Sequence, residues 1–327
     1  MRVREFGEDA LIAAFAQIYQ ARAGVGPESQ EESEAEVQVQ VGIGDDGAVL
    51  LNHGARQVVT TDIATEGVHF NRTWSSAQDI GAKIAIANLA DLFAMGATPH
   101  YLTVAIATSG DEEVSYLLDL ARGIESVAQA HHASIVGGDV VAGKSLTIAI
   151  TALGSVERPV LRSGARPGDH LFLTRMTGRS LAGLLLLSSG VADAQSEQVR
   201  FFQRPDFHPE DLLECGFDNM AALMDISDGL LTDLPKLAKS SAVGIDLDIK
   251  DENMKELREF SEKLGCSTLE LFLRSGEEHS FVVVVPEANL AKVPARWIRI
   301  GRIVEGNRIT LGGVALELTE RSWHWEK

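Results

Sequence analysis

The segment IGAKIAIANLADLFAMGATP, residues 80–99, decides the fold of the first half of the chain. Ser76 and Asp79 have the spacing of a capping box, which predicts that a helix begins just before this segment. Gly96 and Pro99 predict that the helix ends after Met95, because glycine commonly follows a helix and proline cannot continue one. Between these signals the helix is mostly apolar.

Predicted β-strands lie on both sides of this helix, and a second helix follows it. The strands cover residues 48–51, 57–63, 101–108, 133–140 and 145–156. Residues 112–130 have the apolar periodicity of an amphipathic helix. This mixed order of strands and helices predicts an α+β domain that ends near residue 157.

The second half of the chain predicts another α/β domain, which opens with a loop rich in glycine and proline at residues 162–169. Strands are predicted at residues 170–174, 245–249, 280–286 and 297–303, and helices at 181–188 and 252–263, with further helical stretches up to residue 215. The segment ALMDISDGLL, residues 222–231, predicts a strand that turns directly into a helix. We therefore expect two domains, 1–157 and 158–327.

The chain is acidic: its 327 residues include 29 lysines and arginines against 47 aspartates and glutamates, for a formal net charge of −18. This charge argues against nucleic-acid and anionic-membrane partners, because a negative field repels phosphates. A phosphorylated ligand would need cations of its own at the site. The N-terminus lacks a signal-peptide pattern, and no run of about 18 apolar residues is present. These features predict a cytoplasmic globular protein.

The two cysteines, a glutamate-rich segment and a pair of histidines are interpreted as structural or solvent-exposed residues rather than as ligand-binding residues. Cys215 and Cys266 form no metal-spaced pair and are interpreted as small, buried side chains, with a disulfide as the alternative. Five glutamates between residues 28 and 36 predict a solvated loop, with a docking tail as the alternative. His131 and His132 are adjacent and would point in different directions on a helix, which disfavours zinc.

Residues 138–145, GDVVAGKS, match the P-loop pattern G-x-x-x-x-G-K-[ST]. A P-loop requires a helix after the glycine-rich turn, because the helix N-terminus holds the phosphates. The β-branched residues that follow Ser145 favour a strand instead, and Asp139 would repel a phosphate. We interpret the match as accidental, and a P-loop ATPase that uses Lys144 is the alternative.

Aspartates recur at predicted strand ends and turns, beside small residues. They are Asp45, Asp46, Asp62, Asp139, Asp225 and Asp228. An aspartate in a turn often only hydrogen-bonds its own backbone, so each motif alone has a structural explanation. Asp91 is different, because it lies in the apolar helix, where an unpaired carboxylate is costly to bury. Asn88, three residues earlier, shares its helix face.

Many carboxylates with few histidines or cysteines favour a hard cation. Mg²⁺ prefers oxygen ligands and commonly bridges carboxylates to nucleotide phosphates. Phosphoryl transfer depends on neutralising and positioning the phosphates more than on covalent chemistry from the protein. The aspartates therefore predict a Mg²⁺-dependent site for a phosphorylated substrate.

These motifs resemble those of the thiamine-monophosphate kinases, in the superfamily that includes aminoimidazole ribonucleotide synthetase. The matching segments are EFGEDALI (5–12), VGIGDDGAVL (41–50), TTDIATEGVHF (60–70), IGAKIAIANLADLFAMGATP (80–99), VGGDV (136–140), LRSGARPGDHLFLT (161–174), TGRSLAGL (177–184) and MDISDGLLTDL (224–234). They cover nearly the whole chain, and their combination is specific to the kinase.

The resemblance implies a two-domain fold of mixed sheets flanked by helices, in which the N-terminal domains of two subunits form a shared β-barrel. It implies transfer of the γ-phosphoryl group of ATP to thiamine monophosphate, without a general base, to give thiamine diphosphate. The implied Mg²⁺ ligands are Asp46, Thr60, Thr61, Asp62, Asp91, Asp139, Asp225 and Asp228, of which Asp62 and Asp91 are also the implied catalytic residues. The implied nucleotide contacts are Gly138, Asp139, Arg162 and Ser227, and the implied thiamine phosphate contacts are His69, Glu278 and Trp323.

The sequence departs from the family pattern at the implied thiamine end. The family's SGGEDYEL reads SGEEHSF at residues 275–281, and the last residues read RSWHWEK where the family has a glycine, an aromatic residue, Asp, His and Phe. The metal motifs are intact. The alternatives are therefore another ATP-dependent enzyme of the superfamily with a different small phosphorylated acceptor, and a nucleotide-binding protein without activity.

Overall fold

The computed structural model describes residues 14, 17–18, 39–41, 49–50, 56–190 and 196–316. Asp46, Trp323 and the glutamate-rich segment lie outside these residues. Contacts divide the chain into two compact units, of which the first comprises residues 1–92 and 97–157 and the second residues 93–96 and 158–327. The end of the first long helix therefore belongs to the second unit.

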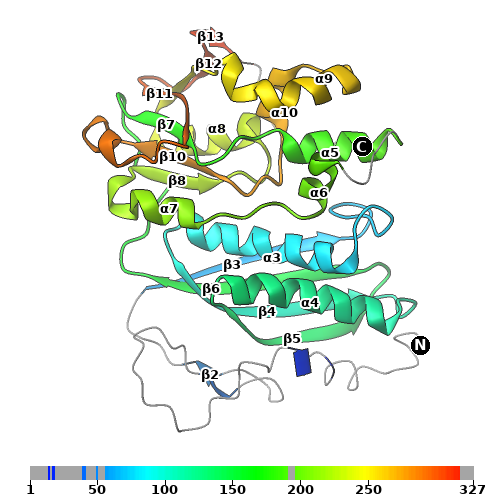
Figure 1. The fold of residues 1–327 in the computed structure, drawn as a ribbon. Helices are drawn as coiled ribbons and strands as arrows, with labels where there is room; N and C mark the ends of the chain where they lie inside the picture. The colour runs from blue at the N-terminus through cyan, green and yellow to red at the C-terminus, as the bar shows by residue number, and fades with distance from the viewer. Residues whose placement is uncertain are drawn as a thin grey trace. The chain divides into compact units, whose positions relative to one another are not determined.

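The first unit is built around a four-stranded sheet in the order β3-β6-β4-β5. Its strands are β3 Arg56–Thr65, β4 Thr98–Thr108, β5 Ser134–Ala142 and β6 Thr147–Val156, and its helices are α3 Ala77–Ala94 and α4 Val114–Ala130. β4 and β5 are parallel, and the other pairs of this sheet are antiparallel. A separate antiparallel pair joins β1 Val39–Val41 to β2 Val49–Leu50. Both helices lie on the same side of the four-stranded sheet (Figure 1).

Alternating side chains give this sheet two different faces. In β6, every second residue from Ile148 to Val156 is buried, and the residues between them are only partly buried. Such alternation directs the apolar residues of a strand toward the helices that cover one face. On β3, Val59 is 60% exposed and Ile63 is 59% exposed. The first unit therefore has one face covered by helices and another with exposed apolar side chains.

Two glycines allow α3 and α4 to pack closely. A Cβ added at Gly81 would lie 2.1 Å from the carbonyl oxygen of Leu120, and one added at Gly123 would lie 2.0 Å from that of Gln78. No side chain fits at either position, because a carbon atom cannot approach a carbonyl oxygen so closely. This contact fixes the position of the helix that carries Asn88 and Asp91.

The second unit is built around a seven-stranded sheet in the order β13-β12-β9-β11-β7-β10-β8. Its strands are β7 His170–Leu173, β8 Ala222–Asp225, β9 Gly244–Leu247, β10 Phe281–Val285, β11 Ile298–Val304, β12 Ile309–Leu311 and β13 Val314–Ala315. Its α-helices are α5 Arg179–Ser188, α6 Glu197–Gln203, α7 Glu210–Cys215, α8 Leu230–Ser241, α9 Arg258–Leu264 and α10 Thr268–Arg274. Short 3₁₀ helices are η2 Phe217–Asn219, η3 Asp251–Leu257 and η4 Glu287–Lys292.

Each face of the seven-stranded sheet has its own apolar core. One core joins Leu171 of β7 to residues of α8 and α10, such as Leu234. The other joins Phe172 to Phe281 and Trp297. Leu171 and Phe172 are neighbours in the sequence but lie in different cores, since successive side chains of a strand point to opposite faces. Segments on both faces therefore hold β8 in place, and β8 ends at Asp225.

The structure confirms the predicted mixed sheets flanked by helices, and it also confirms the strand after Lys144. Residues 147–156 form β6, so no helix follows the P-loop-like motif. The predicted helix at 252–263 is a 3₁₀ helix followed by a short α-helix. The segment that forms α10 was not predicted as a helix.

Two further expectations concern the cysteines and the membrane. Cys215 and Cys266 are both free thiols; Cys215 is buried and Cys266 is half-buried. Among the helices that the structure describes, none has the length and apolar character needed to cross a membrane.

Candidate active site

The first group of candidate residues joins strand β3 to helix α3. Thr60 and Asp62 are two positions apart on β3 and therefore point to the same face, toward the helices. The hydroxyl group of Thr60 donates a hydrogen bond of 2.6 Å to Oδ2 of Asp91 on α3. All three side chains are half-buried. The structure thus brings together three of the residues predicted to bind metal.

Asn88 fixes the position of Asp62 relative to α3. Its side chain is fully buried, and its Oδ1 accepts a hydrogen bond of 3.1 Å from the backbone N–H of Asp62. Its Nδ2 donates to the carbonyl oxygen of Ile84 at 2.9 Å, so both ends of the amide have partners. The predicted shared face of Asn88 and Asp91 is confirmed, since both residues contact β3.

Thr61 and Asp139 lie on the opposite face of the same sheet. Thr61 is next to Thr60, and its hydroxyl group is 2.8 Å from that of Thr151 on β6. The strand register places Thr151 beside Thr103, and Thr103 beside Gly137, two positions before Asp139 on β5. The structure therefore divides the predicted oxygen ligands of the first unit between two faces.

Gly138 precedes Asp139 where two strand backbones approach closely. A Cβ added at Gly138 would lie 1.9 Å from the carbonyl oxygen of Val104 on β4, so only glycine fits. Asp139 is exposed, and its Oδ1 accepts a hydrogen bond of 2.9 Å from the N–H of Val140. The glycine is thus required by the strand pairing itself, whatever it contacts in a complex.

His69 lies in the turn that follows β3. Its Nδ1 accepts a hydrogen bond of 3.1 Å from the backbone N–H of Thr65, which places the proton of a neutral ring on Nε2. The ring is half-buried. The turn therefore fixes the orientation of this predicted substrate contact.

The second group of candidate residues lies where β8 leads into α8. Asp225 is the last residue of β8 and is 3% exposed. The next residues pair with the segment before β10, because Ile226 donates to the carbonyl of Ser280 at 2.9 Å and Glu277 donates to that of Ser227 at 2.8 Å. The strand-to-helix segment predicted to bind metal and nucleotide is thus held by backbone hydrogen bonds.

Asp228 is linked to two residues of α8 that the sequence analysis did not select. Lys236 Nζ donates hydrogen bonds of 2.7 Å to Oδ2 of Asp228 and to Oδ1 of Asp233. Oδ2 of Asp233 accepts the backbone N–H of Asp228 at 3.0 Å. Burial raises the pKa of Asp233 to about 6, while Lys236 acts to lower it. Asp233 and Lys236 are three residues apart, and this i, i+3 spacing was the available signal.

Asp225 has a buried histidine beside it. Nδ1 of His279 lies 3.7 Å from Oδ2 of Asp225, and both side chains are at most 5% exposed. This distance is too long for a hydrogen bond, and His279 Nδ1 has no hydrogen-bond partner in the part of the chain that the structure describes. His279 stands at the position of the aspartate in the family's SGGEDYEL, and its imidazole lies beside Asp225, a predicted metal ligand.

Glu278 stabilises the start of α5. Its Oε1 accepts hydrogen bonds of 2.8 Å from the N–H of Gly178, 3.0 Å from that of Ser180 and 2.5 Å from the hydroxyl of Ser275. The side chain is 1% exposed, and burial raises its pKa, although these donors oppose the rise. Among the described residues its Oε2 has no hydrogen-bond partner.

The backbone around Glu278 explains one departure from the family pattern. Glu277 stands at the position of the family's second glycine and has a φ of 54°, and His279 has a φ of 47°. Both values fall in the left-handed region, which costs a residue with a Cβ roughly 1–2 kcal/mol. A glycine at position 277 would avoid this cost, so the family glycine fits the backbone seen here.

Arg162 and Ser227, the remaining predicted nucleotide contacts, both lie in the second unit. The Arg162 side chain is exposed, and its carbonyl oxygen accepts a hydrogen bond of 2.6 Å from the Ser241 hydroxyl. Ser227 is half-buried and precedes Asp228 directly. Asp46 and Trp323 lie outside the described residues, so their predicted roles stay predictions.

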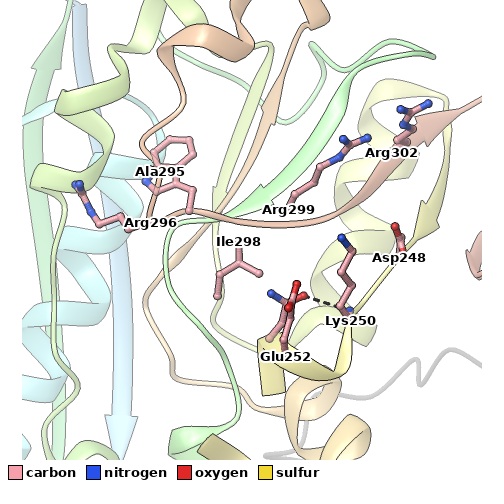
Figure 2. Close-up of a pocket in the computed structure, with 10 residues that line it drawn as sticks. Asp248, Lys250, Glu252, Ala295, Arg296, Ile298, Arg299 and Arg302 are labelled. Carbon is pink, nitrogen blue, oxygen red and sulfur yellow. Dashed lines mark hydrogen bonds between the residues drawn. The ribbon is translucent and has the colours of Figure 1, made fainter. Parts of the chain in front are cut away.

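A pocket of about 610 Å³ lies along β11 in the second unit (Figure 2). Arg299 and Arg302 extend from β11 on one side of it, near Lys250, and Arg296 extends away from them (Figure 2). Arg296 is bound elsewhere, because its Nη2 donates to Oδ1 of the buried Asp211 at 2.8 Å. None of the predicted site residues lines this pocket.

Comparison with known families accounts for most of the chain. Residues 44–156 match the N-terminal domain of AIR synthase related proteins, and residues 166–314 match the C-terminal domain of the same proteins. The thiamine-monophosphate kinase of Corynebacterium glutamicum is 35% identical over 274 residues, which are 80% of this chain and 81% of that protein. The chain belongs to the thiamine-monophosphate kinase family.

Solved structures of this family have the same fold. The thiamine-monophosphate kinase of Stenotrophomonas maltophilia matches with a TM-score of 0.76 at 27% identity, over 97% of this chain and 99% of that one. A structure described as AaThiL complexed with AMPPCP and TMP matches with a TM-score of 0.74 at 28% identity, over 97% of each chain. The two-domain fold expected for the thiamine-monophosphate kinase family is therefore confirmed.

Proposed function

We propose that this protein transfers the γ-phosphoryl group of ATP to thiamine monophosphate, which gives thiamine diphosphate. The observation that carries the proposal is the match to thiamine-monophosphate kinases along most of the chain. One of the matching solved structures is described as a complex with AMPPCP and TMP. The carboxylates on β3, α3 and the β8–α8 segment agree with it, because they supply the oxygen ligands that phosphoryl transfer requires.

We propose Mg²⁺ as the metal that accompanies ATP. Among the described residues, no three histidine, cysteine, aspartate or glutamate side chains gather closely enough to hold an ion alone. The residues nevertheless fit Mg²⁺, since this ion is usually held by one or two carboxylates together with substrate phosphates and water. Asp62 and Asp91 would hold it in the first unit, and Asp225 and Asp228 in the second. When bound, Mg²⁺ supplies the positive charge that neutralises the phosphates.

The chain itself has to orient charged groups rather than remove a proton. A phosphate monoester has a second pKa of about 6, so the attacking oxygen of the acceptor is already ionised near neutral pH. No general base is needed. Thr60 and Asn88 hold Asp91 and Asp62 in place, and the exposed Arg162 is available to a phosphate. Thr61, Asp139 and Gly138 remain proposed contacts to metal or nucleotide.

The acceptor end is where the proposal is most specific to this chain. We propose His69, Glu278 and Trp323 as contacts to thiamine phosphate. The unpartnered Oε2 of Glu278 supports this role, because a buried carboxylate oxygen without a donor is costly unless a ligand supplies one. The departures around Glu278 keep a different phosphorylated acceptor as the alternative.

A product assay tests the function directly. The purified protein is incubated with ATP, Mg²⁺ and thiamine monophosphate, and thiamine diphosphate is measured by chromatography. Product that requires all three components is expected. Absence of product with all three present would refute the kinase assignment, and faster turnover of another phosphorylated acceptor would replace thiamine monophosphate.

We also propose a homodimer that works in the cytoplasm, where ATP is supplied. Val59 and Ile63 are exposed on the face of β3 that points away from the helices. They support a partner there, because a second chain that covered these large apolar side chains would remove them from water. Light scattering of the purified protein is expected to give the mass of two chains. The variant Val59→Asp/Ile63→Asp is expected to give the mass of one, and an unchanged mass would place the interface elsewhere.

A further inference from the structure

One oxygen of the Asp228 carboxylate already has a protein partner. Lys236 Nζ donates to Oδ2 of Asp228 at 2.7 Å, whereas Oδ1 of Asp228 has no hydrogen bond among the described residues. Hydrogen bonds between an ammonium group and a carboxylate are among the stronger ones in proteins. The two oxygens of Asp228 are therefore not equivalent, and Oδ1 is the one available to a ligand.

Asp233 keeps Lys236 in this position. Its side chain is fully buried, and its Oδ1 accepts a second hydrogen bond of 2.7 Å from Lys236 Nζ. Its Oδ2 accepts the backbone N–H of Asp228 at 3.0 Å. Because Asp233 contacts both the main chain of Asp228 and the partner of its side chain, rotation of the Asp228 carboxylate would break this network.

A carboxylate with one oxygen occupied suits some metal ions better than others. Mg²⁺ requires a compact octahedral shell at about 2.0–2.1 Å, which a single oxygen of a carboxylate can join. Ca²⁺ takes about 6–8 oxygens at about 2.3–2.6 Å and readily accepts both oxygens of one carboxylate. When Lys236 holds Oδ2, Asp228 cannot offer both oxygens.

We propose that Lys236, anchored by Asp233, keeps Asp228 a one-oxygen ligand and thereby favours Mg²⁺ over Ca²⁺. This inference rests on the proposed function, in which Asp228 binds a metal ion. Lys236 is a positioning residue, because it acts through Asp228.

A separate observation indicates that a ligand binds here. His279 Nδ1 is buried without a hydrogen-bond partner in the described part of the chain, and it lies 3.7 Å from Asp225 Oδ2, three residues before Asp228. Buried polar atoms are rarely left unsatisfied, so this unpartnered ring nitrogen beside the Asp225 carboxylate points to a group that binds next to both and supplies the missing contact.

The ratio of Ca²⁺ affinity to Mg²⁺ affinity tests the inference. Loss of the Lys236 charge strengthens the binding of both divalent ions by a similar electrostatic amount, which cancels in the ratio. The change in coordination does not cancel. Each ion is titrated calorimetrically into the full-length protein, and the Ca²⁺ concentration that halves thiamine diphosphate formation at fixed Mg²⁺ is measured in parallel.

Three substitutions separate coordination from charge. Lys236→Met is expected to raise the Ca²⁺-to-Mg²⁺ affinity ratio about tenfold, since it frees Oδ2. Lys236→Arg, which retains the cation, is expected to stay within about twofold of the original protein. Lys239→Met is the matched control, because Lys239 is an exposed lysine on the same helix, and its ratio is expected to be unchanged.

The outcomes distinguish this inference from the proposed function. A ratio for Lys236→Met equal to that of Lys239→Met overturns the role of Lys236. If Lys236→Met does not fold, Asp233→Asn replaces it, with an expected rise of about threefold and the same criterion. An unsubstituted protein that forms no thiamine diphosphate and binds neither ion refutes the proposed function, and with it this inference. An active, ion-binding protein with an unchanged ratio refutes the inference alone.

Discussion

Asp91 in the first unit and Asp228 in the second are held by different kinds of donor. Oδ2 of Asp91 accepts a hydrogen bond of 2.6 Å from the neutral hydroxyl of Thr60. Oδ2 of Asp228 accepts one of 2.7 Å from the charged ammonium of Lys236. A hydroxyl orients a carboxylate, whereas an ammonium also offsets its charge. Thr60 and Lys236 therefore both orient a carboxylate, but only Lys236 also offsets the negative charge of that carboxylate.

The largest effect is expected from Asp91→Asn. Asparagine keeps the shape and the contact with Thr60 but removes the negative charge that attracts Mg²⁺. We expect kcat to fall about 10²–10³-fold, as when one preorganised electrostatic group is removed from an active site. The melting temperature is expected to change little, since Asp91 is only half-buried.

Asp228→Asn is the matched comparison for this substitution. It is expected to lower kcat as well, because both residues are proposed metal ligands. Full activity of Asp91→Asn combined with an inactive Asp228→Asn would show that Asp91 is not a required metal ligand, whereas Asp228 is.

Asp211 shows what a cation-bound carboxylate does away from the candidate site. Its Oδ2 accepts a hydrogen bond of 2.7 Å from Arg175, and its Oδ1 accepts one of 2.8 Å from Arg296. We expect Asp211→Asn to lower the free energy of unfolding by about 2–3 kcal/mol, since two charge-assisted contacts are lost. kcat is expected to be unchanged, in contrast to Asp91→Asn.

The stability difference at Asp211 also has a defined pH dependence. Burial alone would raise the pKa of Asp211, but Arg175 and Arg296 hold it below its usual value. The stabilisation is therefore complete above the ordinary aspartate pKa of about 4 and is lost as the pH falls through the lower folded pKa. Urea unfolding at several pH values measures it, and a difference that grows toward acid pH would contradict the assignment.

Much of the first site follows from local sequence rules. Helix periodicity placed Asn88 and Asp91 on one face, and the strand after Ser145 followed from its β-branched residues. The strand period of two also implies that Thr60 and Thr61 point to opposite faces, so a set of predicted ligands that contains both residues cannot lie on one face of the sheet.

Other parts of the site depend on contacts that no local rule supplies. Thr61 and Asp139 share a face only because β3, β6, β4 and β5 pair in an order that differs from their order along the chain. The bridge from Lys236 to Asp228 joins residues eight positions apart across a turn and a helix. Such register and side-chain reach are decided by packing, which the sequence motif does not record.

Thr60→Val is expected to have a moderate effect. Valine has nearly the same volume as threonine but no hydroxyl, so Asp91 keeps its charge and loses its orienting donor. We expect the Mg²⁺ concentration at half-maximal rate to rise about 3–10-fold, which corresponds to about 1 kcal/mol for a hydrogen bond, with kcat little changed. An equal loss in kcat would show that Thr60 contributes to the chemical step as well as to the position of Asp91.

Lys144→Ala is expected to have the smallest effect on activity. Lys144 and Lys236 differ in what the sequence and the structure show of them. Lys144 matches a phosphate-binding pattern in the sequence but is exposed and is followed by strand β6. Lys236 matches no pattern but bridges Asp228 and Asp233. Without a helix N-terminus behind it, Lys144 lacks the amide groups that hold phosphates in a P-loop, so we expect ATP turnover to fall less than about twofold. Loss of most of the turnover in this variant, with its melting temperature unchanged, would mean that Lys144 contacts the nucleotide after all and that pattern outweighs local structure here.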